Sequence, residues 1–310
     1  MSSFFKGVLV MEVRKNALAE MTVEQAIDAN GLGWEVEKVP LFCSDDLSNA
    51  SGGYAIRNVE TKKVLGITGK NYVQLQNRVA FKHFQPFLDQ GFAELSTAGS
   101  FKHGSVVYMQ ARIKADPIKI VEGDYIDRYI LMSHGHNGKM SVRFGFTPIR
   151  IVCENVLAIA HNHRGAELIR VKHSNQTDLA LGDLQRAMTN ANMRFEASAE
   201  QYKALARKSI NQNDLNKYIK RLFKLDNLTG VEQKQKDSKI IEKINNLFEN
   251  GKGNDLQLVK NTWWAAYNGV TDYFTHSIGF DQNRRDESLL LGQNNRINAR
   301  ALDMALEMAF

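Results

Sequence analysis

Two pairs of histidines have the residue type and spacing that come closest to a metal site. His134 and His136 form one pair, and His161 and His163 form the other, 27 residues further along the chain. Two imidazoles and a carboxylate can hold a transition metal, but no acidic residue is spaced convincingly with either pair. We expect His134 and His136 to be exposed at a turn. A metal-dependent, nuclease-like enzyme is the third of three functional hypotheses.

Other motifs for catalysis or phosphate binding are incomplete. The segment from Gly66 to Lys70 has two residues between its glycines, whereas a phosphate-binding loop needs four, so a plain turn is the simpler interpretation. No Gly-x-Ser-x-Gly motif is present. Cys153 ends an apolar run, as a buried thiol does. The sequence therefore predicts no catalytic residue, no cofactor and no bound metal ion.

Basic and aromatic residues form the stronger pattern. Arg143 is followed on one predicted strand by two aromatic residues of the same face, Phe144 and Phe146. Phosphate pairing combined with base stacking is typical of proteins that bind single strands without sequence preference. The alternative is that both aromatics face the core. The candidate nucleic-acid-binding residues are Arg57, Lys62, Lys63, Lys70, Tyr72, Arg78, Arg143, Phe144 and Arg150.

Charge is unevenly distributed along the 310 residues, whose formal net charge is +6. Residues 1–50 carry 4 Lys/Arg and 8 Asp/Glu, residues 51–175 carry 17 and 9, and residues 176–310 carry 19 and 17. The excess of positive charge in the middle segment suggests a polyanionic partner. Two cysteines exclude a disulfide scaffold, and 43% hydrophobic residues exclude a disordered chain.

The elements that must position these residues change character near the last proline, Pro148. Before it, apolar alternation and turn residues predict strands and two helices. The strands are expected at residues 34–39, 54–59, 63–67, 92–96, 105–114, 118–121, 125–133 and 140–146, and the helices at 23–30 and 76–90. After it, the composition favours helices at 153–161, 178–209, 214–225, 237–250, 261–278 and 296–310. Residues 252–255 and 279–287 are expected to be mobile loops.

These patterns predict an α+β fold. A strand-rich domain, an antiparallel sheet with helix over residues 1–175, is followed by a mainly helical region over 176–310. No apolar run approaches the roughly 18 residues of a membrane span, and the apolar start of the chain lacks a cleavage site. We expect a cytoplasmic protein of a bacterial host cell, with no membrane partner.

Several sequence strings occur in an order typical of one family. The most specific is Arg143–Asn155, preceded by Gly66–Tyr72 and followed in the helical part by Asn261–Tyr273. Over roughly residues 30–305, the chain resembles the phage/plasmid-like proteins that carry the domain of unknown function number 932. That resemblance implies no settled activity. Gly135 stands where members usually have an acid after Ser-His, and Val156 replaces a threonine, so a catalytic cluster is not implied.

A looser similarity, in the order of elements only, is to phage single-strand annealing recombinases, which form rings or filaments and hold single-stranded DNA without ATP. The leading hypothesis is therefore binding of single-stranded DNA, with ATP-independent strand annealing in phage or plasmid recombination. A homo-oligomer is expected, with the helical region around Trp263 and Trp264 in subunit contacts or in the core. The second hypothesis is a mobile-element interaction module that binds or inhibits a host or phage protein.

Overall fold

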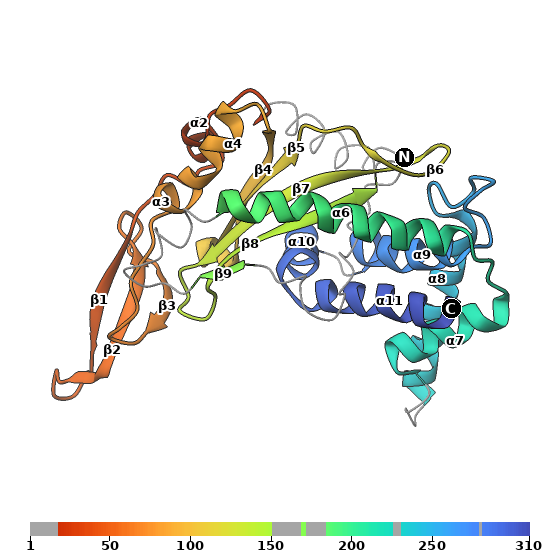
Figure 1. The fold of residues 1–310 in the computed structure, drawn as a ribbon. Helices are drawn as coiled ribbons and strands as arrows, with labels where there is room; N and C mark the ends of the chain where they lie inside the picture. The colour runs from red at the N-terminus through yellow and green to blue at the C-terminus, as the bar shows by residue number, and fades with distance from the viewer. Residues whose placement is uncertain (1–17, 151–168, 172–183, 226–230, 279–280) are drawn as a thin grey trace, which may run out of the picture. The chain divides into compact units, whose positions relative to one another are not determined.

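The computed structural model describes residues 18–150, 169–171, 184–225, 231–278 and 281–310, and divides them into two compact units (Figure 1). The first unit contains residues 18–115, 129–146, 169–171 and 184–190. The second contains residues 116–128, 147–150 and the described residues from 191 onward. Both units are interleaved along the chain, so a single boundary near residue 175 does not separate them.

A three-stranded antiparallel sheet, in the order β1-β2-β3, forms one part of the first unit. Its strands are β1 (Val36–Phe42), β2 (Asn49–Asn58) and β3 (Val64–Thr68). Val36 pairs with Asn58 and Tyr54 with Thr68, which places alternate side chains on one face. That face buries Val36, Ile56 and Leu65, and Trp34 and Tyr72 pack against them. The sheet therefore has a small core of its own.

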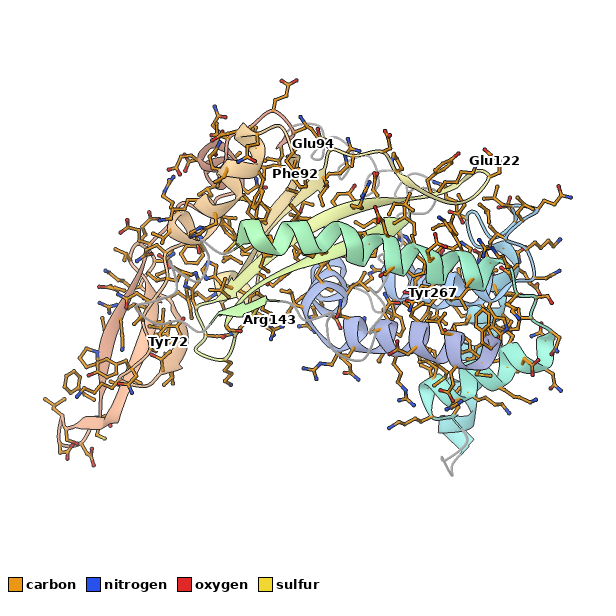
Figure 2. The ribbon with its side chains drawn as sticks, in the orientation of Figure 1. Tyr72, Phe92, Glu94, Glu122, Arg143 and Tyr267 are labelled. Atoms are coloured by element: carbon orange, nitrogen blue, oxygen red, sulfur yellow. The ribbon has the colours of Figure 1, made fainter. Side chains whose placement is uncertain are left out.

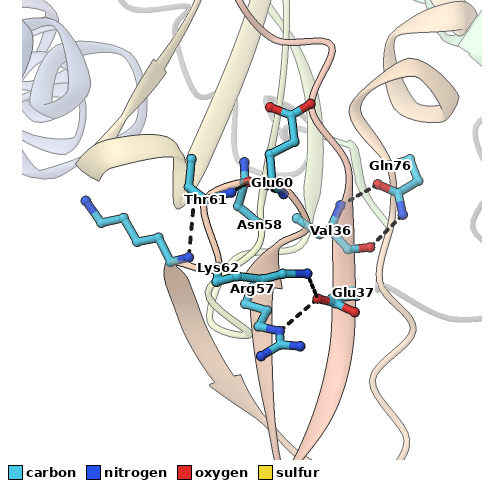
Figure 3. A network of polar contacts seen from close by, with 9 residues as sticks. Val36, Glu37, Arg57, Asn58, Glu60, Thr61, Lys62 and Gln76 are labelled. Carbon is cyan, nitrogen blue, oxygen red and sulfur yellow. Dashed lines mark hydrogen bonds and ion pairs between the residues drawn. The ribbon is translucent and has the colours of Figure 1, made fainter.

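The edge strand β1 is closed to further pairing by two devices. The side chain of Gln76 accepts a hydrogen bond from the Val36 N–H at 2.9 Å and donates one to the Val36 carbonyl at 2.8 Å (Figure 3). The N–H and carbonyl of Val36 point away from β2. Because strand backbone repeats every two residues, the backbone nitrogen of Pro40 points the same way, so its missing N–H costs no hydrogen bond to β2. Both devices blunt an edge that would otherwise pair with another chain.

A larger sheet has the strand order β4-β5-β7-β8-β9, and β6 also pairs with β7. The strands are β4 (Ala93–Phe101), β5 (Val106–Ile113), β6 (Ile118–Val121), β7 (Asp124–Gly135), β8 (Val142–Arg150) and β9 (Ile169–Val171). Residues 129–135 of β7 pair antiparallel with β5 in the first unit, whereas residues 124–126 pair with β6 in the second. Long strands with apolar alternation thus lie where the sequence predicts them.

Short helices complete the first unit. In α2 (Val23–Ala29), Thr22 accepts a hydrogen bond from the Gln25 N–H at 3.2 Å, and the Gln25 side chain accepts one from the Thr22 N–H at 2.9 Å. This capping box satisfies two N–H groups that a helix start leaves open. The helix predicted at 76–90 is divided into α3 (Asn77–Phe81), a 3₁₀ turn (Lys82–Phe84) and α4 (Gln85–Asp89). Pro86 has no N–H to donate back into the preceding turn, so it stands in the first turn of α4, where that N–H is not needed.

Helices make up most of the second unit (Figure 1). They are α6 (Leu184–Ala206), which begins in the first unit, α7 (Gln212–Phe223), α8 (Val231–Asn250), α9 (Trp263–Asp272), α10 (Gln282–Leu291) and α11 (Gln293–Ala309). Every residue of α9 is buried, and the Trp264 indole donates to the Asp124 carboxylate at 2.8 Å. Tyr267 lies in the same aromatic core (Figure 2).

The structure bears on three expectations for the helical region. Trp263 and Trp264 are 4% and 0% exposed, so of the two alternatives given for them they pack in the core of the second unit. Residues 282–287 of the mobile loop expected at 279–287 are helical and lie in α10. In the other expected loop, buried Asn254 donates to the carbonyls of Leu247 and Ala265, which ties the segment to α8 and α9.

The predicted fold class is confirmed: an antiparallel sheet region with helix precedes a mostly helical region. The helix expected at 153–161 lies outside the described residues. In the described part of the chain, no helix combines the length and apolar character that a membrane crossing requires.

Candidate nucleic-acid interface

The strand β3 is held against the turn between β7 and β8 by close backbone packing. A Cβ at Gly66 would lie 2.3 Å from the Cα of Asn137, and a Cβ at Gly138 would lie 2.9 Å from the Ile67 carbonyl oxygen. Such approaches are possible only for glycine, which carries no Cβ. The two segments are therefore fixed next to each other, although 71 positions separate them in the sequence.

Two lysines stand at the start of β3 beside a second basic turn. Lys62 and Lys63 are exposed in the β2–β3 turn. The turn between β4 and β5 places Lys102 and His103, also exposed, close by, because Ser105 donates to the Leu65 carbonyl at 3.0 Å. Positive φ angles at Lys102 (49°) and His103 (56°) are unusual for residues with a side chain, so this turn keeps a strained backbone while presenting two basic groups.

Three further lysines meet at the far end of β3. Lys70 is exposed two residues after the strand, and Lys139 is exposed directly after Gly138, which packs on β3. The Lys38 ammonium donates to the carbonyls of Lys70 and Tyr72, at 2.7 Å each, and lies 4.5 Å from the centroid of the Tyr54 ring. Among the described residues, no carboxylate pairs with Lys38, Lys70 or Lys139.

We call Lys38, Lys63, Lys70, Lys102 and Lys139 the cationic stripe. Lys63 and Lys70 are separated by seven residues, which corresponds to about 23 Å at the rise of a β-strand. Between them, β3 exposes two aliphatic side chains, with Val64 53% and Ile67 66% exposed. The stripe therefore combines positive charge with an accessible apolar surface on one short strand. Lys38 pairs with buried Ile56 in the ladder, so it reaches the end of β3 from the face opposite to Val64 and Ile67.

Two predicted phosphate ligands on this sheet share a carboxylate. Glu37 accepts from Arg57 at 2.8 Å and from Lys62 at 3.1 Å (Figure 3). These hydrogen bonds, first from Lys62 and then from Arg57, lower the pKa of Glu37 from its ordinary value. The carboxylate thus offsets part of the charge that Arg57 and Lys62 would offer to a polyanion.

Arg78 is also neutralised locally. Its guanidinium pairs with Asp28 at 2.6 Å and with Glu24, both on α2. Two acids around one guanidinium leave a local excess of negative charge, so the role predicted for Arg78 as a phosphate ligand is not supported by its surroundings. The position is better described as a link between α2 and α3.

The predicted stacking residues belong to the core. Phe144 is 1% exposed and packs edge-on against Phe146, so it offers no face to a base, and its predicted stacking role is wrong. Tyr72 lies beside β3 (Figure 2), where its ring packs on the small core and its hydroxyl donates to the Gly135 carbonyl at 3.0 Å. Burial raises the pKa of Tyr72 well above its ordinary value.

Two further predicted residues lie on β8. Arg143 is half-buried and pairs across the ladder with Arg170 of β9. Arg150 is the last residue of β8, and its side chain lies outside the described residues. Of the nine predicted residues, Lys63 and Lys70 are exposed without a carboxylate partner among the described residues, and their role as phosphate ligands stays a prediction. Lys38, Lys102 and Lys139 of the stripe were not among the nine, although each is a lysine on or beside a predicted strand end.

The first histidine pair is buried and not exposed at a turn as expected. His134 and His136 are both 0% exposed, with ring centroids 4.8 Å apart, and the His136 ring bonds to Asn77 at 2.9 Å. The rings of Trp34 and Phe81 pack against them in tilted arrangements. His161 and His163 lie outside the described residues. Within the described residues, the one grouping of potential metal ligands is Cys43 with Asp45 and Asp46, in an exposed turn.

Fold and surface together define an α+β protein with a lysine-rich surface along one short strand. The chain belongs to the family described as Domain of unknown function (DUF932), whose model matches residues 64–302. The match begins at the first residue of β3, so β1 and β2 precede it. Comparison with the curated proteins finds no match, and comparison with the solved structures finds none either.

Proposed function

We propose that the chain binds single-stranded DNA without enzymatic turnover, through the cationic stripe. The observation that carries the proposal is the exposure of Lys63, Lys70 and Lys139, which have no carboxylate partner among the described residues, around an exposed apolar strand. Phosphates would pair with the lysines, while bases or deoxyribose would contact Val64 and Ile67. This combination of charge and apolar contact is how sequence-tolerant single-strand binders work.

Single strands fit this surface better than a duplex does. A duplex stacks its bases inside the helix and presents phosphates outward, so it would leave Val64 and Ile67 uncovered. A single strand can turn its bases toward the protein and cover both side chains. We therefore propose a preference for single-stranded over double-stranded DNA, with strand annealing in phage or plasmid recombination as the process it serves.

Binding to the stripe would depend steeply on salt. Each neutralised phosphate of a single strand contributes a slope of about −0.7 to the plot of log affinity against log salt. The four lysines of the stripe other than Lys38 would give a slope of about −2.8, which is a loss of roughly fiftyfold between 50 and 200 mM salt. A nucleic-acid site made mainly of apolar contacts would lose far less.

The test is fluorescence anisotropy with labelled single-stranded and duplex DNA at both salt concentrations. The variant Lys63→Glu with Lys70→Glu is expected to weaken single-strand binding at least about tenfold and to reduce the salt slope by about 1.4. Its matched control, Lys252→Glu with Lys260→Glu, makes the same charge change at exposed positions of the second unit and should bind normally. Equal loss in both variants, or no binding by the natural chain, would refute the proposal.

A further inference from the structure

The turn between β1 and β2 is acidic and apolar, the opposite of the cationic stripe in charge. Phe42 and Leu47 are 57% and 74% exposed, and Asp45 and Asp46 between them are exposed as well. No basic residue occurs between Lys38 and Arg57. We call residues 42–47 the acidic tip. Four of the large apolar residues that the described chain exposes are Phe42 and Leu47 of the tip and Val64 and Ile67 of β3.

The acidic tip has a defined backbone. The Cys43 N–H donates to the Ser48 carbonyl at 2.8 Å, and the Leu47 N–H donates to the Cys43 carbonyl at 3.0 Å. Leu47 has a φ of 54°, in the left-handed region that leucine rarely adopts, and this conformation directs an apolar side chain into solvent. Ser48 donates its N–H to Asp46 at 2.8 Å, and this bond lowers the pKa of that carboxyl, which keeps the tip negative.

We propose that the acidic tip of one copy docks on the β3 surface of a second copy. Phe42 and Leu47 would cover Val64 and Ile67, while Asp45 and Asp46 would face lysines of the cationic stripe. Opposite charges around matching apolar centres are the features that select one docking arrangement over others. The proposal goes beyond nucleic-acid binding, because it concerns the protein alone.

A second copy is the occupant because the same chain cannot supply the tip. The tip extends from β1 and β2, which are hydrogen-bonded in one sheet with β3, so it cannot fold back onto that strand. A contact between two tips would oppose Asp45 and Asp46 to the same acids, and a contact between two β3 surfaces would oppose lysines. Like charges placed directly opposite each other disfavour both symmetric contacts.

Head-to-tail docking has a structural consequence. An interface between two different surfaces of one chain leaves a free tip at one end and a free β3 surface at the other, so it continues into a ring or an open filament. The contact involves few residues on each side, and interfaces of that size are weak and transient. Assembly should therefore depend on protein concentration and weaken at high salt.

The test is sedimentation velocity of the full chain without nucleic acid, at up to about 100 μM, a range that detects weak interfaces. Two charge-reversed variants are used: Asp45→Lys with Asp46→Lys, and Lys63→Glu with Lys70→Glu. Each alone should lower the association constant at least about tenfold, because its tip and its β3 surface then carry the same sign. An equimolar mixture should assemble again, because the reversed tip of one variant then faces the reversed β3 surface of the other, and the two unreversed surfaces face each other, so both contacts join opposite charges.

The control is Glu249→Lys with Asp255→Lys, which changes the charge equally at exposed positions of the second unit and should assemble like the natural chain. A natural chain that stays monomeric at about 100 μM, variants that assemble unchanged, or a folded mixture that does not assemble would overturn the inference. Anisotropy with DNA separates the two proposals: a natural chain that binds DNA without self-association removes the docking alone, and a natural chain that self-associates without binding DNA removes the proposed function alone. The tip variant should lose self-association and keep DNA binding.

Discussion

Phe144 packs in the core in this structure, whereas the sequence pattern suggested that it stacks on bases. Replacing Phe144 is therefore the sharpest mutational test of this structure. The side chain is 1% exposed and its ring centroid lies 6.3 Å from that of Phe84 and 5.8 Å from that of Phe146. Phe144→Ala removes most of a buried ring and leaves a cavity. Such changes cost about 3–5 kcal/mol of unfolding free energy.

That loss is large compared with the stability of a typical domain, about 5–15 kcal/mol, so the folded state of Phe144→Ala is expected to be only marginally stable. Phe144→Leu keeps most of the apolar volume and should lose clearly less, because the cavity is smaller. Leucine has no aromatic face, so it would still abolish stacking. The two variants together therefore separate packing from stacking.

Urea unfolding of both variants measures the stability change, and anisotropy with single-stranded DNA measures binding by the folded protein. We expect stability to fall in the order natural chain, Phe144→Leu, Phe144→Ala, with unchanged DNA affinity for Phe144→Leu. The reasoning would be refuted by the reverse pattern, in which Phe144→Leu has natural stability and loses DNA affinity. A stacked aromatic contributes about 1–3 kcal/mol per base, so its loss would be measurable.

Two further predictions concern the packing of β3 and the alkaline limit of stability. Gly66→Ala should destabilise the first unit by about 1–3 kcal/mol in urea unfolding, because its Cβ would overlap the Asn137 backbone and force it to move, whereas Gly69→Ala, with open space around it, is the control and should change little. Burial raises the pKa of several tyrosines above the ordinary value of 10.0. Their contribution to the free energy of unfolding is complete below that pH. It is lost as the pH rises above it, because the unfolded chain then releases the tyrosine protons and the folded chain does not. Tyrosinate absorbance followed together with circular dichroism should show ionisation coinciding with unfolding, and ionisation at pH 10 in a folded chain would contradict the burial of Tyr72, Tyr202, Tyr218 and Tyr273.

Local patterns determined the secondary structure because the interactions that produce it are close in sequence. The capping box of Thr22 and Gln25 spans three residues, and the alternation in β5 and β7 repeats every two. The excess of positive charge was equally visible as a count. The α10 helix was missed because its sequence has the polar, glycine-flanked composition of a loop, with a mean hydropathy too low to show an apolar stripe.

Tertiary contacts decided which charges remain available. Arg78 lies 50 positions from Asp28, and Arg57 lies 20 positions from Glu37, so no local pattern reveals either pair. Lys63 and Lys70 carry the same charge in the sequence but have no such neighbour in the described chain. The sequence does not distinguish a lysine or arginine that has a carboxylate partner from one that has none, because the fold is what brings the partner close.

The sequence by itself thus determined the α+β class, the positions of most strands and helices, and the basic character of the middle segment, since each depends on composition or on neighbours within a few residues. Only the tertiary structure decided that Phe144, His134 and His136 are buried, because an alternating strand states which residues share a face and not which face meets the core. It also decided that residues 116–128 join the second unit, since the Asp124 carboxylate finds its indole partner 140 positions away.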